Sequence, residues 1–128
     1  MLIRIDADNP VPLEDQIAAS VRQAIARGEV APDGDLPSVR QLAGDLGVHW
    51  NTVARAYRKL SDEGLLQVRR GRGAIVRARE GAVSAATRAR LRDGLIDLIA
   101  IGRVGGLTRG DLTRLFRAAL ASFEERKR

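Results

Sequence analysis

Residues 38–64 read SVRQLAGDLGVHWNTVARAYRKLSDEG and decide the fold of the first half of the chain. Apolar residues recur with helical spacing over residues 39–46 and again over residues 53–60. Gly47 ends the first of these predicted helices, and the second must begin two or three residues later. Two short helices joined by a tight turn that contains glycine are typical of a helix-turn-helix.

The segment before this motif is predicted to contain a short arm, one helix and a linker. Residues 2–6 have the pattern of a short strand or extended arm, which Pro10 ends. Apolar residues then recur with a helical period over residues 13–27, and Gly28 follows as a candidate C-cap. Residues 32–37 are rich in proline, glycine and aspartate, which indicates a turn and a linker.

The segment after the motif changes to the pattern of a β-hairpin. Two short apolar runs, residues 65–68 and 74–76, flank a turn of arginine and glycine at residues 69–73. A helix, a helix-turn-helix and then a basic hairpin follow one another in the order of a winged helix-turn-helix. The predicted fold class is therefore mostly α with a small β-hairpin.

The last part of the chain is predicted to form an α-helical hairpin, with the break between its two helices at residues 102–106. Both helices carry apolar stripes that a small winged helix does not need for its own core, and a second copy of the chain is the simplest partner for them. We therefore predict a DNA-binding domain over residues 1–78 and a two-helix dimerisation tail over residues 79–128. The candidate dimerisation residues are Leu91, Leu95, Leu98, Ile99, Leu112, Leu115, Phe116, Leu120 and Phe123.

Composition excludes several classes of protein. A chain of 128 residues holds one domain, or one small domain with an appendage. With no cysteine and one histidine, it has no disulfide, no thiolate metal site and no histidine-rich metal cage. No apolar run is long enough for a membrane span or a signal peptide, so a cytoplasmic protein is expected. No phosphate-binding loop, complete dinucleotide fingerprint or compelling carboxylate pair is present, so we expect neither an enzyme nor a cofactor.

The net charge of +6 is unevenly distributed. Residues 1–64 contain 7 basic and 10 acidic side chains, a net charge of −3, whereas residues 65–128 contain 15 and 6, a net charge of +9. Five arginines and no acidic residue lie within residues 69–79. This run favours a nucleic acid as partner, although basic runs are also found on ordinary solvated surfaces and an excess of arginine can reflect genome composition.

The residues of the helix-turn-helix suggest where DNA would bind. Its second helix would enter the major groove with its N-terminal residues at the base edges. Asn51, Arg55 and Lys59 follow one another at four-residue spacing on one face, although any surface helix has a polar face. Asparagine can pair with adenine and arginine with guanine. Trp50 can either contact the DNA backbone or pack over the turn.

Two further features have both a functional and an ordinary interpretation. Arg40 lies in the first turn of its helix, where the helix dipole disfavours a cation, so it either reaches DNA or pairs with Asp35 or Asp45. The glycines of the hairpin tip allow a close approach to a narrow groove, or they simply make a tight turn. The candidate DNA-binding residues are Arg40, His49, Trp50, Asn51, Thr52, Arg55, Arg70, Gly71 and Arg72.

A series of short motifs with fixed spacing runs through residues 10–78. It comprises PLEDQI at 12–17, LPSVRQLA at 36–43, LGV at 46–48, NTVARAY at 51–57, Leu60, EGL at 63–65 and RGRG at 70–73. This series closely resembles the GntR family of bacterial transcription regulators. The short tail of 50 residues is similar to that of the YtrA subfamily, whose two helices serve dimerisation.

The resemblance implies a homodimer that binds an operator with inverted half-sites. Such a regulator usually represses transcription and often lies near transporter genes. The family often has Ser or Asn, and then Arg or Pro, where this chain has His49 and Trp50. Transferred by position, the family's DNA contacts fall on Arg40, His49, Asn51, Thr52, Arg55, Arg70 and Gly71.

Two other functions are compatible with the sequence. A winged-helix module could use its surplus helical faces for a protein partner and bind DNA without sequence preference. A sensor with a small-molecule site between the tail helices is disfavoured, because few polar groups of the tail face inward. The main prediction is a sequence-specific DNA-binding repressor that binds double-stranded DNA as a homodimer, with residues 49–63 in the major groove and residues 69–74 at the minor groove.

Overall fold

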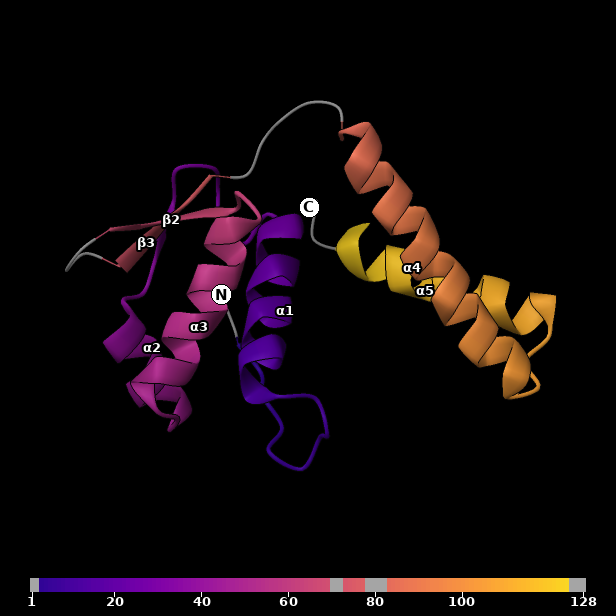
Figure 1. Cartoon of the computed structure of the whole chain (residues 1–128), viewed down its shortest axis with the longest axis horizontal. Coiled ribbons are helices and arrows are strands. Elements are labelled where there is room, and N and C mark those ends of the chain that lie inside the picture. The colour runs from indigo at the N-terminus through magenta and orange to yellow at the C-terminus, as the bar shows by residue number, and fades with distance from the viewer. Residues whose placement is uncertain (1–2, 70–72, 78–82, 125–128) are drawn as a thin grey trace. The chain divides into compact units, whose positions relative to one another are not determined.

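The computed structural model describes residues 3–69, 73–77 and 83–124, and the chain divides into two compact units, residues 1–79 and 80–128. In the first unit, helix α1 (Leu13–Ala26) lies alongside helix α3 (Trp50–Asp62), as Figure 1 shows. Helix α2 (Val39–Leu46) also packs against α3. The three helices that the apolar periodicity predicts are therefore present.

One hydrophobic core holds these helices and the sheet together. The α3 residues Val53, Ala56, Tyr57 and Leu60 are all buried in it, because their spacing places them on one face of the helix. Isoleucine, leucine, valine and alanine side chains from the other elements complete the core. These are Ile17, Ala18 and Val21 of α1, Leu36, Leu42 and Ala43 around α2, and Leu66, Ala74 and Val76 of the sheet.

The sheet has three strands, where the sequence predicted a hairpin of two. Strands β2 (Leu66–Arg69) and β3 (Gly73–Val76) are the antiparallel pair, and β1 (Asp35–Leu36) pairs with the other edge of β3, so that the strand order is β1-β3-β2. Strand β1 lies where a turn and linker were predicted. The arm at residues 3–6 contains no strand, although Ile3 and Ile5 pack partly buried against the core.

Gly73 and Tyr57 fix the segment between β1 and α2. Gly73 has a φ of +78°, and a Cβ atom at this position would lie 2.6 Å from the carbonyl oxygen of Leu36. The Tyr57 hydroxyl donates a hydrogen bond of 2.7 Å to the carbonyl oxygen of Pro37. The segment that leads into α2 is therefore held between β3 and the core face of α3.

The second unit is the predicted helical hairpin, with helices α4 (Ala85–Val104) and α5 (Arg109–Glu124). Helix α4 continues to Val104, through the start of the predicted break. Thr108 and Asp111 form a capping box, in which the Asp111 carboxylate accepts from the Thr108 amide and the Thr108 hydroxyl accepts from the Asp111 amide. The hydrogen bond with the Thr108 backbone is the largest cause that lowers the pKa of Asp111, and the hydrogen bond with the Thr108 side chain is the next.

Most of the candidate dimerisation residues are exposed within this unit. Leu98 is 64% exposed, and Leu112 and Phe123 are partly buried. Leu112 packs close to Gly102, so part of its surface is used inside the hairpin. Within the described residues, no helix has the length and apolar character needed to span a membrane. The exposed members of the set are Leu91, Leu95, Leu98, Ile99, Leu115, Phe116 and Leu120.

Candidate nucleic-acid interface

Helix α2 begins at a well-formed cap and presents Arg40 to solvent. The Ser38 hydroxyl accepts a hydrogen bond of 3.1 Å from the Gln41 amide. Arg40 is exposed in the first turn. Neither Asp35 nor Asp45 forms an ion pair with it, and no other described residue does. The alternative role of Arg40, an ion pair with Asp35 or Asp45, is therefore not found among the described residues.

The face of α3 opposite the core contains Asn51, Arg55 and Arg58. At 3.6 residues per turn, these three positions lie within about 60° of one another around the helix. Both arginines are exposed, and neither forms an ion pair with a described residue. Arg58 was missed by the sequence reasoning, which followed a strict four-residue spacing. The i, i+4, i+7 pattern from Asn51 would have found it.

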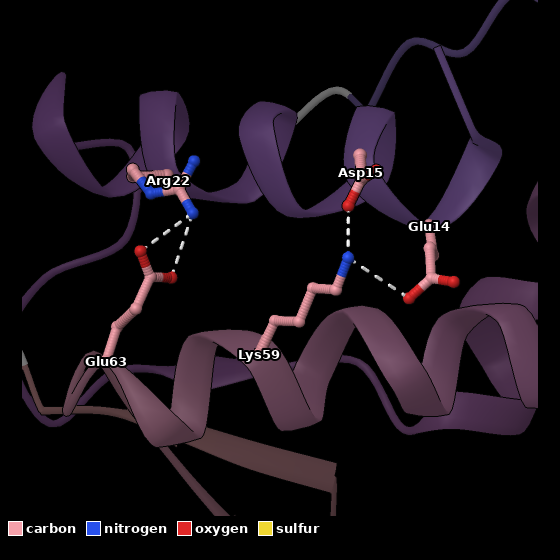
Figure 2. A network of polar contacts seen from close by, with 5 residues as sticks. All are labelled: Glu14, Asp15, Arg22, Lys59 and Glu63. Carbon is pink, nitrogen blue, oxygen red and sulfur yellow. Dashed lines mark hydrogen bonds and ion pairs between the residues drawn. The ribbon is translucent and has the colours of Figure 1, made fainter. Parts of the chain in front are cut away.

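Lys59 lies at the margin of this face, about 80° around the helix from Asn51, and its charge is paired with acidic residues of α1. Its ammonium group forms ion pairs with Asp15 and, at 3.3 Å, with Glu14, both in the first turn of α1 (Figure 2). The hydrogen bond to Asp15 is the largest cause that raises the pKa of Lys59. Lys59 therefore joins α3 to α1, although its side chain remains 47% exposed.

A second ion pair between α1 and α3 lies further along the helices. One guanidinium nitrogen of Arg22 donates to both carboxylate oxygens of Glu63, at 2.9 and 2.8 Å (Figure 2). Surface ion pairs of this kind add little to stability individually. Together with the two ion pairs of Lys59, this ion pair links α1 to α3 and to Glu63, the residue that follows α3.

The first residues of α3 are held by His49. Its imidazole Nδ1 accepts a hydrogen bond of 3.1 Å from the Asn51 amide, so His49 is the N-cap of the helix. The rings of His49 and Trp50 stack with centroids 5.6 Å apart and an interplanar angle of 29°. Trp50 is 49% exposed, and Asn51 and Thr52 are partly buried. The two aromatic rings thus lie together at the exposed beginning of the helix.

The basic hairpin is described only in part. Arg70, Gly71 and Arg72, the predicted tip residues, lie outside the described residues. On the strands that lead to them, Arg69 is exposed and pairs in register with Gly73. Arg77, after β3, is exposed and lies 3.9 Å from the Asp33 carboxylate.

The described candidate DNA-binding residues all lie in the first unit, and the candidate dimerisation residues lie in the second. Arg40, the start of α3 and its outer face lie on neighbouring helices of the helix-turn-helix. This group offers amide, imidazole and guanidinium donors that have no acidic partner within the part of the chain that the structure describes. Such donors suit the acceptor-rich edges and phosphates of nucleic acid.

Comparisons with known proteins agree with this chemistry. The family model described as bacterial regulatory proteins, gntR family, matches residues 13–76. The HTH-type transcriptional regulator Rv1152 of Mycobacterium tuberculosis is 37% identical over 112 residues, which cover 88% of each chain. The HTH-type transcriptional repressor YtrA of Bacillus subtilis is 36% identical over 75 residues, which cover 59% of this chain and 58% of YtrA.

Solved structures are also similar to this chain, and two of them bear on its function. YtrA from Sulfolobus acidocaldarius, a GntR-family transcription factor, has a TM-score of 0.64 at 36% identity and covers 78% of this chain and 99% of its own. The AraR DNA-binding domain in complex with operator ORR3 has a TM-score of 0.51 at 25% identity and covers 59% and 92%. These relatives are regulators rather than enzymes, as the sequence predicted. The chain therefore belongs to the GntR family, where its similarity to two YtrA proteins supports the YtrA-like subfamily, and it is a transcription regulator with a DNA-binding winged helix.

Proposed function

We propose that this regulator is a homodimeric repressor that reads an inverted-repeat operator. Helix α3, with its cap at His49, enters the major groove, and the hairpin around residues 69–74 lies at the minor groove. The observation on which this rests is the exposed face of α3, where Arg55 and Arg58 have no ion pair among the described residues. An AraR domain of the same fold that binds an operator supports the proposed mode of binding.

The candidate residues other than His49 have the following roles in this proposal. Asn51 and Arg55 contact base edges, because they lie nearest the beginning of the helix on its exposed face. Arg40 and Arg58 contact phosphates or bases at either side of the groove. Trp50 and Thr52 contact the sugar-phosphate backbone, and the tip residues contribute charge at the minor groove. The tip residues are Arg70, Gly71 and Arg72.

Dimerisation through the second unit is the other half of the proposal. Exposed apolar side chains line α4, with Leu91, Leu95 and Leu98 on one stripe, and their burial between two copies removes apolar surface from water. Two-fold symmetry of the protein then matches the two-fold symmetry of an inverted repeat. Repression follows if the dimer occupies its operator and thereby excludes the polymerase, and the name of the B. subtilis relative supports this direction.

Selection of bound fragments from random double-stranded DNA, followed by footprinting, tests the proposal. We expect an inverted repeat with half-sites about 34 Å apart, one turn of the double helix. Salt-dependent binding without sequence preference would instead indicate a protein-interaction module that binds DNA loosely. A reporter gene placed behind the selected sequence then distinguishes repression from activation.

A further inference from the structure

The His49 ring is restrained on two sides at the beginning of α3. Nδ1 is bound to the Asn51 amide at 3.1 Å, and the ring stacks on Trp50 at 5.6 Å between centroids. An exposed histidine normally rotates freely between rotamers. Here the cap and the stacking together select one orientation of the ring.

The cap also determines which chemical group His49 presents to a ligand. A nitrogen that accepts a hydrogen bond has no proton, so the single proton of the neutral imidazole is on Nε2. The Nδ1 and Nε2 atoms of an imidazole point in directions about 140° apart, so Nε2 is directed away from the Asn51 amide to which Nδ1 is bound. His49 is exposed, and no described residue accepts a hydrogen bond from Nε2. The result is one oriented N–H donor.

We propose that this donor makes His49 a specificity-determining residue that selects a guanine in each half-site, through a bond from Nε2–H to guanine N7. The inference rests on the proposed placement of α3 in the major groove. Guanine presents two adjacent acceptors there, O6 and N7, whereas cytosine presents a donor and adenine places a donor beside its N7. Thymine O4 stands next to a methyl group. A group that can only donate therefore fits guanine best.

Two variants separate this role from the structural role of the cap. His49→Ser keeps a good N-cap, because serine is among the preferred residues at that position, but it removes the Nε2 donor. His49→Ala removes both. We expect only His49→Ala to lower the thermal stability of the first unit, while both variants lose the same sequence preference. Equal loss of preference without equal loss of stability assigns the effect to the donor.

The test begins with selection of DNA fragments bound by the wild-type chain and by His49→Ser. We expect His49→Ser to lose the preference for a G·C pair at one symmetric pair of positions and to bind the wild-type operator about tenfold more weakly. Replacement of that guanine by 7-deazaguanine, which lacks N7, should weaken wild-type binding about tenfold and leave His49→Ser unchanged.

Four outcomes would overturn the inference. An unchanged preference of His49→Ser at every position would exclude base recognition by His49. Equal weakening on all sequences would place Nε2 on a phosphate, and a lost preference for an A·T pair would assign the wrong base. Absence of any sequence preference in the wild-type chain would overturn the proposed function itself, and this inference with it, so the two failures are distinguishable.

Discussion

The Tyr57 hydroxyl, on the core face of α3, donates a hydrogen bond of 2.7 Å to the carbonyl oxygen of Pro37. This bond connects the helix proposed to read DNA with the segment that precedes α2. It spans 20 residues of sequence and is the polar contact by which the otherwise apolar side of α3 holds that segment.

Tyr57→Phe should therefore destabilise the first unit by about 1–2 kcal/mol, because the Pro37 carbonyl loses its partner while the apolar ring remains. Urea unfolding followed by the fluorescence of Trp50, the single tryptophan, measures the change. Gln67→Ala, an exposed change on β2, serves as the control and should leave the stability nearly unaltered. Equal stability of Tyr57→Phe and the wild type would contradict the assigned role of the bond.

Stability at high pH should also depend on Tyr57. Burial raises the pKa of its hydroxyl, so the unfolded chain loses this proton at lower pH than the folded chain does. The contribution of Tyr57 to stability is complete below the ordinary tyrosine pKa of about 10 and is lost as the pH rises beyond it. Because the chain has one tyrosine, tyrosinate absorbance should appear only as the protein unfolds. In Tyr57→Phe, the decline of stability above that pH should be shallower.

Arg58 and Lys59 are neighbours in sequence but should respond differently to charge removal. Arg58→Gln should lower the slope of log affinity against log salt by about 0.9, because one phosphate contact is lost, and leave stability unchanged. Lys59→Gln should leave the slope unchanged and lower the melting temperature, because Glu14 and Asp15 lose their partner. DNA-binding titrations at several salt concentrations, with thermal melts, compare the two. The opposite assignment of effects would show that the exposed face of α3 has been misidentified.

Gly73 and Gly47 both have a positive φ, but only Gly73 is crowded by backbone. Gly47→Ala, with nothing within 4 Å of the added Cβ, should cost roughly 1–2 kcal/mol for the left-handed backbone alone. Gly73→Ala adds a Cβ 2.6 Å from the Leu36 oxygen and should cost roughly 2–5 kcal/mol. The difference between the two free energies of unfolding measures the packing of β3 against β1. Similar losses of unfolding free energy in the two variants would mean that the backbone around Gly73 and Leu36 can shift to accommodate the added Cβ.

The proposed dimer interface makes Leu98 a sensitive position. Leu98→Glu should give a monomer in sedimentation equilibrium, because a charge would be buried between the copies. Affinity for the full operator should fall at least about 100-fold, since the two half-sites are then bound by separate monomers rather than by one dimer. Asp93→Arg, on the side of α4 opposite the stripe of Leu91, Leu95 and Leu98, is the matched control and should remain dimeric. A Leu98→Glu variant that still dimerises would place the interface elsewhere.

The helices could be predicted from sequence because each has a complete local signal. Val53, Ala56, Tyr57 and Leu60 form an apolar stripe that identifies α3 without reference to the rest of the chain. Strand β1 could not be found in this way. Its two residues have no period of their own, and they become a strand only because β3, about 40 residues later, supplies the pairing.

The sequence allowed the residue types of the candidate site to be predicted, but not the directions in which their side chains point. The position of Lys59, at the margin of the exposed face, fits either DNA or α1, and the carboxylates of Glu14 and Asp15 decide between them. His49 was recognised as a helix-start residue, but a sequence does not show which ring nitrogen makes the cap. Such choices depend on contacts made across the fold or on side-chain rotamers, which periodicity does not contain.

The pairing of β1 with β3 has a consequence for the shape of the bound DNA. Backbone hydrogen bonds and the close approach at Gly73 fix the distance between the beginning of α2, where Arg40 lies, and the strand that leads from the hairpin tip. With the DNA contacts proposed above, this fixed spacing favours a double helix whose grooves already match it or can be deformed to match it. Base steps that deform easily should then be preferred even at positions that no side chain touches.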